Sequence, residues 1–163
     1  MSDSEVTVVE LFFDEAIIAI SNLGGLGGKR ATNATTPPVL LFVNVATLGD
    51  GRTVNLEVSN ITSYEAYNSE NNGLTVKANG TFGVVNLLSP SGDNPHLSTF
   101  VQLRYAFKDA ATGEPLTLPR THFTFYDFDS GKSGIRECLQ AKGGIVSTGL
   151  TNDTELEEVD PAS

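Results

Sequence analysis

Two aspartates two residues apart, Asp127 and Asp129, are the residues of this chain whose types and spacing best suit chemistry. They end an alternating stretch, residues 121–134 (THFTFYDFDSGKSG), in which Phe123 and Phe125 precede them at the same spacing. Alternate residues of an extended chain share one face, so the two carboxylates are expected ~6–7 Å apart, where an apolar face meets its rim. Like charges so close together repel, and some opposite charge or donor must offset that repulsion.

A bound calcium ion is the first candidate for that role. Ca²⁺ takes about six to eight oxygen ligands, and short loops that combine acids with glycine can supply them. The stretch DFDSGKSG contains two acids, a serine hydroxyl, loop carbonyls and two glycines, but it does not match the EF-hand pattern. Further oxygens must therefore come from elsewhere, and Asp93, Asn94 and the loop 68–72 (NSENN) are the predicted donors.

Two alternatives need no metal, and the sequence leaves them open. Arg104, Lys132 or Arg136 could pair with the aspartates as internal cations. The backbone N–H groups of the following loop could instead cap the carboxylates in Asx-turns.

Catalysis is not expected from the remaining candidates. Paired carboxylates can hydrolyse glycosidic bonds, but the chain has no tryptophan, and its phenylalanines occupy mostly alternating positions typical of a core. His96 and His122 lack the spacing of zinc ligands. The single cysteine, Cys138, is predicted to be a buried structural thiol. The sequence contains no nucleophile elbow, phosphate-binding loop or dinucleotide-binding motif.

Composition restricts the partners. The 163 residues include 20 acidic and 10 basic ones, for a formal charge of −10, which is the wrong sign for nucleic acid or anionic lipid. No apolar run approaches the ~20 residues of a membrane helix. An extracellular, secreted protein is expected, although no secretory signal is found at the start. Four glycosylation sequons, against about two expected by chance, favour secretion slightly: Asn33, Asn60, Asn79 and Asn152.

Period-two alternation dominates the chain and predicts strands. The apolar run 39–47 and the alternating run 53–61, joined by the Asp-Gly turn 49–52, predict a hairpin with Val54, Leu56 and Val58 on one face. Leu103, Tyr105 and Phe107 are likewise expected to share a face. The other predicted strands are 5–13 with its continuation 15–23, 80–88, 96–109, 121–129, 135–141, 144–149 and 153–159.

The sequence thus predicts an all-β protein: a single antiparallel β-sandwich of jelly-roll type with about nine short strands. One domain is expected over 1–163. Residues 21–38, rich in Gly, Thr and Pro, are predicted to form a long surface loop. The acidic tail 157–163 is expected to fray.

Four motifs resemble a known group of proteins: residues 22–27 (NLGGLG), residues 80–83 (GTFG), residues 106–118 (AFKDAATGEPLTL) and residues 123–139 (FTFYDFDSGKSGIRECL). They are similar to lectin-like β-sandwich modules of large secreted or surface proteins in marine algae and bacteria. The resemblance covers about residues 21–144 and implies an extracellular, adhesive or lectin-like module that depends on Ca²⁺ and has no catalytic activity. The positions that carry it are Asp109, Thr112, Gly113, Pro115, Leu118, Phe123, Phe125, Asp127, Asp129, Gly134 and Glu137.

These observations favour a non-catalytic binding module that holds Ca²⁺ through Asp127 and Asp129 and contacts a carbohydrate or a cell-surface polymer. The alternative is a structural protein that self-associates through sheet edges or the Gly-rich loop into a coat or filament. A glycosidase is a distant third hypothesis.

Overall fold

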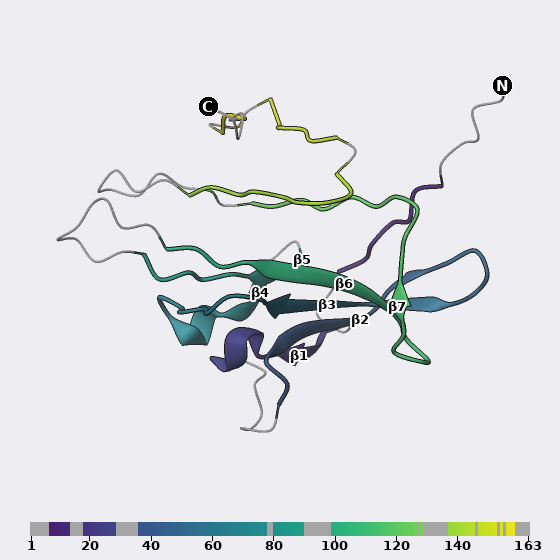
Figure 1. Cartoon of the computed structure of the whole chain (residues 1–163), viewed down its shortest axis with the longest axis horizontal. Helices are drawn as coiled ribbons and strands as arrows, with labels where there is room; N and C mark the ends of the chain where they lie inside the picture. Colours follow the sequence, from purple (N-terminus) through teal and green to yellow (C-terminus); the bar gives the residue numbers. More distant parts are fainter. Residues whose placement is uncertain are drawn as a thin grey trace. The chain divides into compact units, whose positions relative to one another are not determined.

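The structure is a computed structural model, and its chain forms two compact units, Met1–Phe123 and Thr124–Ser163, each of which is described by itself (Figure 1). The single domain predicted over the whole chain stays a prediction. The residues described are 7–13, 18–28, 36–77, 80–89, 99–126, 128, 137–145, 147–152, 154 and 156–158.

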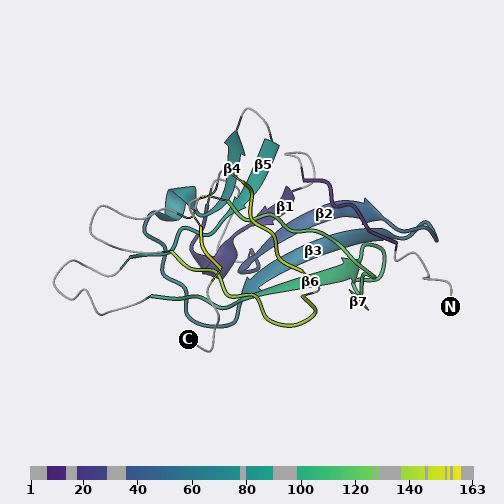
Figure 2. The ribbon, with the colours of Figure 1, turned by 90° about the horizontal axis from the view of Figure 1, so that it is seen from above.

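An antiparallel sheet of five strands, in the order β1–β2–β3–β6–β7, forms the framework of the first unit (Figures 1 and 2). The predicted hairpin with the Asp-Gly turn is confirmed as β2 and β3, and the N–H of Leu48 donates to the carbonyl of Arg52 (2.8 Å) across the turn. The strands are β1 (Ile18–Ser21), β2 (Val39–Thr47), β3 (Thr53–Asn60), β6 (Leu103–Asp109) and β7 (Pro115–Leu116).

A second, two-stranded sheet is made by β4 (Gly73–Lys77) and β5 (Gly80–Val84), and Figure 2 shows it as a separate hairpin. Two short 3₁₀ helices, η2 (Leu23–Gly25) and η3 (Ser69–Asn71), complete the regular elements. Gly73 has φ +90°, and a Cβ there would lie 2.5 Å from the Ser21 hydroxyl oxygen. The base of the hairpin therefore packs directly on β1 at a position that only glycine fits.

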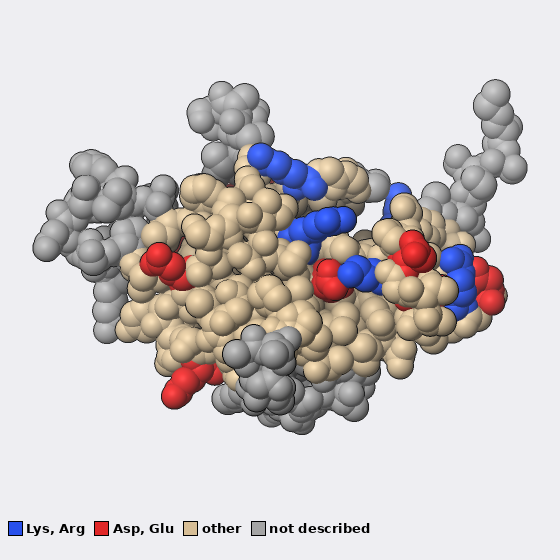
Figure 3. Space-filling view, turned by 60° about the horizontal axis from the view of Figure 1, so that its bottom comes forward, with Lys and Arg blue, Asp and Glu red and all other residues tan. Residues whose placement is uncertain are grey.

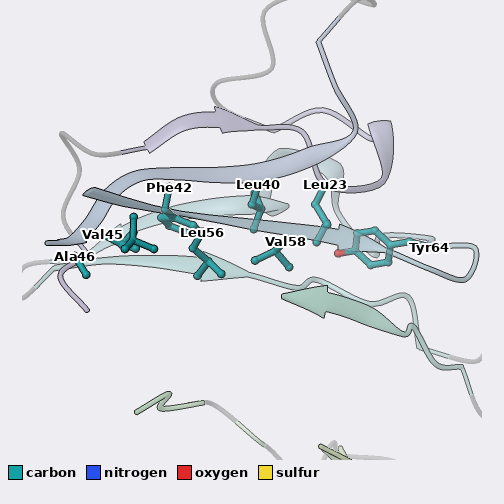
Figure 4. Close-up of a cluster of buried hydrophobic side chains, with 9 residues drawn as sticks. Leu23, Leu40, Phe42, Val45, Ala46, Leu56, Val58 and Tyr64 are labelled. Atoms are coloured by element: carbon teal, nitrogen blue, oxygen red, sulfur yellow. The ribbon is translucent and has the colours of Figure 1, made fainter. Parts of the chain in front are cut away.

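The hydrophobic core lies along one face of the five-stranded sheet. Val54, Leu56 and Val58 are all buried, which confirms their predicted common face. The register places Leu56 between Phe42 of β2 and Phe107 of β6, and Figure 4 shows the buried side chains in one layer along the strands. Each such apolar side chain stabilises the fold by about 1.5–3 kcal/mol.

The segment 21–38 begins inside the protein, so the predicted surface loop is wrong for its first residues. Leu23 is fully buried and belongs to the core. The side-chain amide of Asn22 donates to the carbonyl of Thr36 (2.8 Å) and accepts from the N–H of Gly27 (3.0 Å). A glycine-rich segment can be buried when side chains satisfy its backbone polar groups, and glycine content alone does not reveal that.

The carboxamide of Asn72, fully buried, connects several segments of the first unit. Its nitrogen donates to the carbonyls of Leu23 (2.9 Å) and Gly27 (3.4 Å). Its oxygen accepts from the hydroxyl of Tyr64 (2.7 Å), which itself accepts from the N–H of Asn86 (2.8 Å). Burial raises the pKa of Tyr64, so the hydroxyl remains a donor at neutral pH. We call this set of hydrogen bonds the Asn72 network.

The β6–β7 connection forms a turn over residues 110–114. Asp109, the last residue of β6, is 8% exposed, and its carboxylate accepts from the N–H groups of Ala111 (2.9 Å) and Thr112 (3.1 Å). The backbone carbonyl of Asp109 accepts from the N–H of Gly113 (2.8 Å). The hydrogen bonds from Thr112 and Ala111 lower the pKa of Asp109, because they favour its charged form.

Four strands predicted towards the C-terminus are not found among the residues that the structure describes there. Thr148 and Glu158 form a side-chain hydrogen bond (2.7 Å) in the second unit, but the described residues of this unit carry no strand. Alternation specifies an extended backbone, whereas a strand also needs a hydrogen-bonded neighbour. The strands concerned are 121–129, 135–141, 144–149 and 153–159. The predicted frayed tail lies outside the described residues from 159 onward.

The β-rich, antiparallel class predicted from the sequence is confirmed. The described residues contain seven strands, of which β7 has only two residues. The sandwich and the nine strands stay predictions. No helix within the described ranges is long and apolar enough to cross a bilayer.

Removing the Tyr64 hydroxyl tests the Asn72 network. Tyr64→Phe leaves the Asn72 oxygen and the Asn86 N–H without their buried partner, and we expect the free energy of unfolding to fall by about 1–3 kcal/mol. Urea denaturation measures the loss. Tyr67→Phe is the matched control, because Tyr67 is 74% exposed. Equal stability of the two variants would contradict the structural role of the network.

Asp109 makes stability depend on pH in a defined direction. Its folded-state pKa lies below the unfolded value of about 3.9, so its contribution is complete above that value and is lost as pH falls through the folded pKa. Asp109→Asn should therefore lower the melting temperature at pH 7, and the difference from the wild type should shrink below about pH 4. Glu114→Gln, which changes an exposed acid of the same turn, is the control. A difference that is constant with pH would show that the charge of Asp109 is irrelevant.

Candidate functional site

The residues predicted to bind calcium, Asp127, Asp129, Asp93 and Asn94, all lie outside the described residues, so that site stays a prediction. The further predicted donor, the loop 68–72, forms η3, and its last residue belongs to the Asn72 network. Within the described ranges, no group of three or more His, Cys, Asp or Glu side chains could hold a metal ion.

The structure describes three other residues that the sequence analysis singled out. Phe123 packs edge-on against Tyr105, with ring centroids 5.5 Å apart, and also contacts Phe107 (6.0 Å), but it remains 38% exposed and is not part of the core. His122 is exposed, as expected for a residue at the end of an alternating stretch. Cys138 is exposed as well, and the prediction of a buried thiol is wrong. Cysteine is among the residue types most often buried, but a preference of the residue type does not decide the burial of one position.

The structure offers a different site, which starts from residues 7–13, here called the strap. A strand was predicted for this segment, but its described residues carry none. The N–H of Val9 donates to the carbonyl of Arg120 (2.8 Å), and the N–H of Phe12 donates to the carbonyl of Val45 of β2 (2.8 Å). The hydroxyl of Thr121 also donates to the carbonyl of Val9 (2.8 Å). The strap therefore runs between the end of β2 and the chain after β7.

Alternation gives the strap two faces. Val9, Leu11 and Phe13 pack against the core, and the rings of Phe13 and Phe42 meet edge to face at 5.2 Å. The residues between them, Glu10 and Phe12, are exposed. The strap thus covers part of the core with one row of side chains and presents the other row to solvent.

Beside the strap, β2 contains a bulge. Phe42 pairs with Leu56 and Ala46 pairs with Val54, so three residues of β2 face the single residue Asn55 of β3. A bulge of this kind bends the strand and re-aims its side chains, and bulges are frequent beside binding sites.

Asn44 is at the centre of the bulge and has φ +57°, in the left-handed region that few residues other than glycine adopt. Its N–H donates to the side-chain oxygen of Asn55 (2.9 Å), which holds the conformation. Val45 and Ala46, which follow, are both buried, whereas Asn44 itself is exposed. The bulge therefore shifts the burial pattern of β2 and turns a polar amide outward.

The strap and the bulge enclose an open groove of about 430 Å³, the strap groove. One side is formed by residues 7–10 and Phe12, and the other by Asn44 and residues 46–49. Phe12 is 63% exposed, so an aromatic ring stands at the edge of the groove. The polar groups available to a ligand are the carboxylate of Glu10, the amide of Asn44 and the hydroxyls of two threonines.

The electrostatics of the groove depend on Glu10. No basic side chain in the described part of the chain lies within ion-pair distance of its carboxylate. The nearby β2–β3 turn is neutralised internally, because Asp50 and Arg52 form an exposed ion pair (2.7 Å). The hydrogen bond from the Arg52 side chain lowers the pKa of Asp50. Figure 3 shows acidic and basic side chains interspersed on the face in view, without a patch of one sign.

This combination of groups suits a ligand with many hydroxyls and an apolar face. An amide and a carboxylate can bond several hydroxyls, and an exposed aromatic ring packs against C–H groups. Ligand sites commonly combine apolar surface with a few polar groups of this kind.

No protein-family model matches the chain, and no curated protein or solved structure is significantly similar to it. The resemblance to lectin-like modules therefore stays a prediction. None of the three groove residues Glu10, Phe12 and Asn44 was predicted from the sequence to be a site residue. The alternation of residues 7–13 was the available signal for the first two, and the one amide within the apolar run 39–47 was the signal for the third.

Proposed function

We propose that this protein is a non-catalytic binding module whose ligand is a carbohydrate or a carbohydrate-bearing surface polymer, bound in the strap groove. The observation that supports the proposal most is the exposed ring of Phe12 beside the Asn44 amide and the Glu10 carboxylate. The finer architecture belongs to the same proposal: a jelly-roll-like sandwich of about nine strands, working outside the cell.

The strained backbone of Asn44 supports the proposal independently. A non-glycine residue at positive φ costs free energy, of order 1–3 kcal/mol, and such residues concentrate at binding and catalytic sites. Here the conformation is held by the bond to Asn55, and it places an amide that makes no hydrogen bond among the described residues at the groove.

Calcium is the proposed cofactor of the module. Asp127 and Asp129 would supply carboxylate ligands, with Asp93 and Asn94 as further oxygen donors. The support is the sequence: two acids on one face of an alternating stretch, followed by a glycine-containing loop. The ion would neutralise their repulsion and order the loop.

Binding in the strap groove is tested by titrating the isotope-labelled protein with neutral oligosaccharides and following its amide NMR signals. We expect the signals of residues 7–12 and 44–49 to move. Phe12→Ala should weaken binding by about fivefold or more, because losing one well-placed aromatic contact costs about 1 kcal/mol or more.

Phe100→Ala is the matched control for this test, because Phe100 is 67% exposed and lies outside the groove lining. It should bind like the wild type. Signals that stay unchanged with every oligosaccharide, or equal binding by the two alanine variants, would overturn the proposed function.

Thermal unfolding in excess calcium and in chelator tests the cofactor. At calcium concentrations about 100 times the dissociation constant, binding adds about 2.7 kcal/mol, which raises the melting temperature by about 5–10 °C. The double variant with Asp127→Asn and Asp129→Asn should lose this rise. Asp50→Asn, which removes an acid paired with Arg52, should keep it. Identical unfolding of the wild type in calcium and in chelator would exclude the ion.

A further inference from the structure

We infer that the strap groove selects saccharides that carry a protonated amino group, and that the carboxylate of Glu10 binds this group. This inference rests on the proposed function and specifies its ligand class. It starts from the position of Glu10 on the outward row of the strap, two residues before Phe12 and within the groove lining.

The carboxylate of Glu10 is the unneutralised charge of the groove. Within the described part of the chain it has no ion-pair partner, and the nearby Arg52 is already bound to Asp50. A carboxylate can only accept hydrogen bonds. Its best partner is therefore a cationic donor, because a charge-assisted bond is about twice as strong as a neutral one.

The charge of the whole chain acts in the same direction. A formal charge of −10 favours the approach of cations and opposes that of anions. Sulfated and uronic-acid polymers are therefore disfavoured at this groove. Neutral sugars can bind through hydroxyls alone, and amino sugars gain the additional interaction with Glu10.

The spacing of Glu10 and Phe12 explains why a saccharide fits better than an isolated ammonium ion. Residues two apart on an extended chain are ~6–7 Å apart on one face, a distance that a single sugar ring with its substituents can cover. A ring packed on Phe12 can thus direct an amino substituent to Glu10. An ammonium near an aromatic face is also attracted by the ring. The Asn44 amide across the groove remains for the hydroxyls.

The experiment compares three oligosaccharide probes of equal length by titration calorimetry: glucosamine oligomers (cationic), N-acetylglucosamine oligomers (neutral) and galacturonic acid oligomers (anionic). For the wild type at low salt, the cationic probe should bind about two- to fivefold more tightly than the neutral one, as expected for one exposed ion pair. The anionic probe should bind most weakly. The preference for the cationic probe should decrease at high salt, because exposed charges are screened.

Two charge-matched variants separate Glu10 from the general charge of the protein. Glu10→Gln should reduce the affinity ratio of cationic to neutral probe to about one. Glu65→Gln changes the net charge equally at an exposed acid outside the groove lining and should keep the wild-type ratio. If both variants behave alike, the preference comes from the overall charge and the role of Glu10 is wrong.

The remaining outcomes distinguish this inference from the proposed function. If the neutral probe binds as tightly as the cationic one, the selectivity is wrong while a carbohydrate module stands. If no saccharide binds, both the selectivity and the proposed carbohydrate-binding function are wrong. A tetralysine peptide serves as the last probe: binding as tight as that of the glucosamine oligomer, and unaffected by Phe12→Ala, would show that the groove recognises cationic peptides instead.

Discussion

The buried carboxamide of Asn72 is the polar interaction on which the first unit depends. A side chain with no exposed surface must satisfy its donors and its acceptor within the protein, since an unpaired buried group costs about 1–3 kcal/mol. Asn72 does so with three partners from two segments: the carbonyls of Leu23 and Gly27 and the hydroxyl of Tyr64. Each of these groups would lose a hydrogen bond if Asn72 moved. The network thus holds the Gly-rich segment against the sheet, although that segment has almost no regular structure.

The strap imposes a second constraint, because the core is closed on one side by a segment that is not a strand. A few isolated hydrogen bonds hold residues 7–13, and Val9, Leu11 and Phe13 add their packing on the core. One of these bonds joins the strap to the bulged part of β2, where the carbonyl of Val45 accepts the N–H of Phe12. The groove is a consequence of this packing, and its two sides come from residues far apart in the sequence.

Local features of the sequence were sufficient to predict the β2–β3 hairpin. Alternation and the Asp-Gly turn act over a few residues, and the common face of Val54, Leu56 and Val58 follows from the period of an extended chain. The four strands predicted after residue 120 were wrong where the structure describes them, because alternation does not guarantee a neighbouring strand.

Neither the Asn72 network nor the strap groove could be predicted in the same way. Asn72 and its acceptor Leu23 are 49 residues apart, and no local pattern links them. Asn44 stands in an apolar run that predicts a regular strand, and its positive φ depends on the bond to Asn55 of the next strand. The alternation of the strap was visible, but alternation alone does not say which sheet the segment covers. The calcium site at Asp127 and Asp129 remains a prediction from the sequence.

Most residues of the strap either pack on the core or line the groove, and alternation largely separates the two sets. Leu11 and Phe13 pack on the core, Glu10 and Phe12 line the groove, and Val9 does both. A shift of one residue would exchange the two rows, burying the carboxylate and exposing Leu11, which is why the register is strongly specified. Because Glu10 and Phe12 are exposed and do not pack on the core, substitutions there can change the chemistry of the groove without removing a core contact.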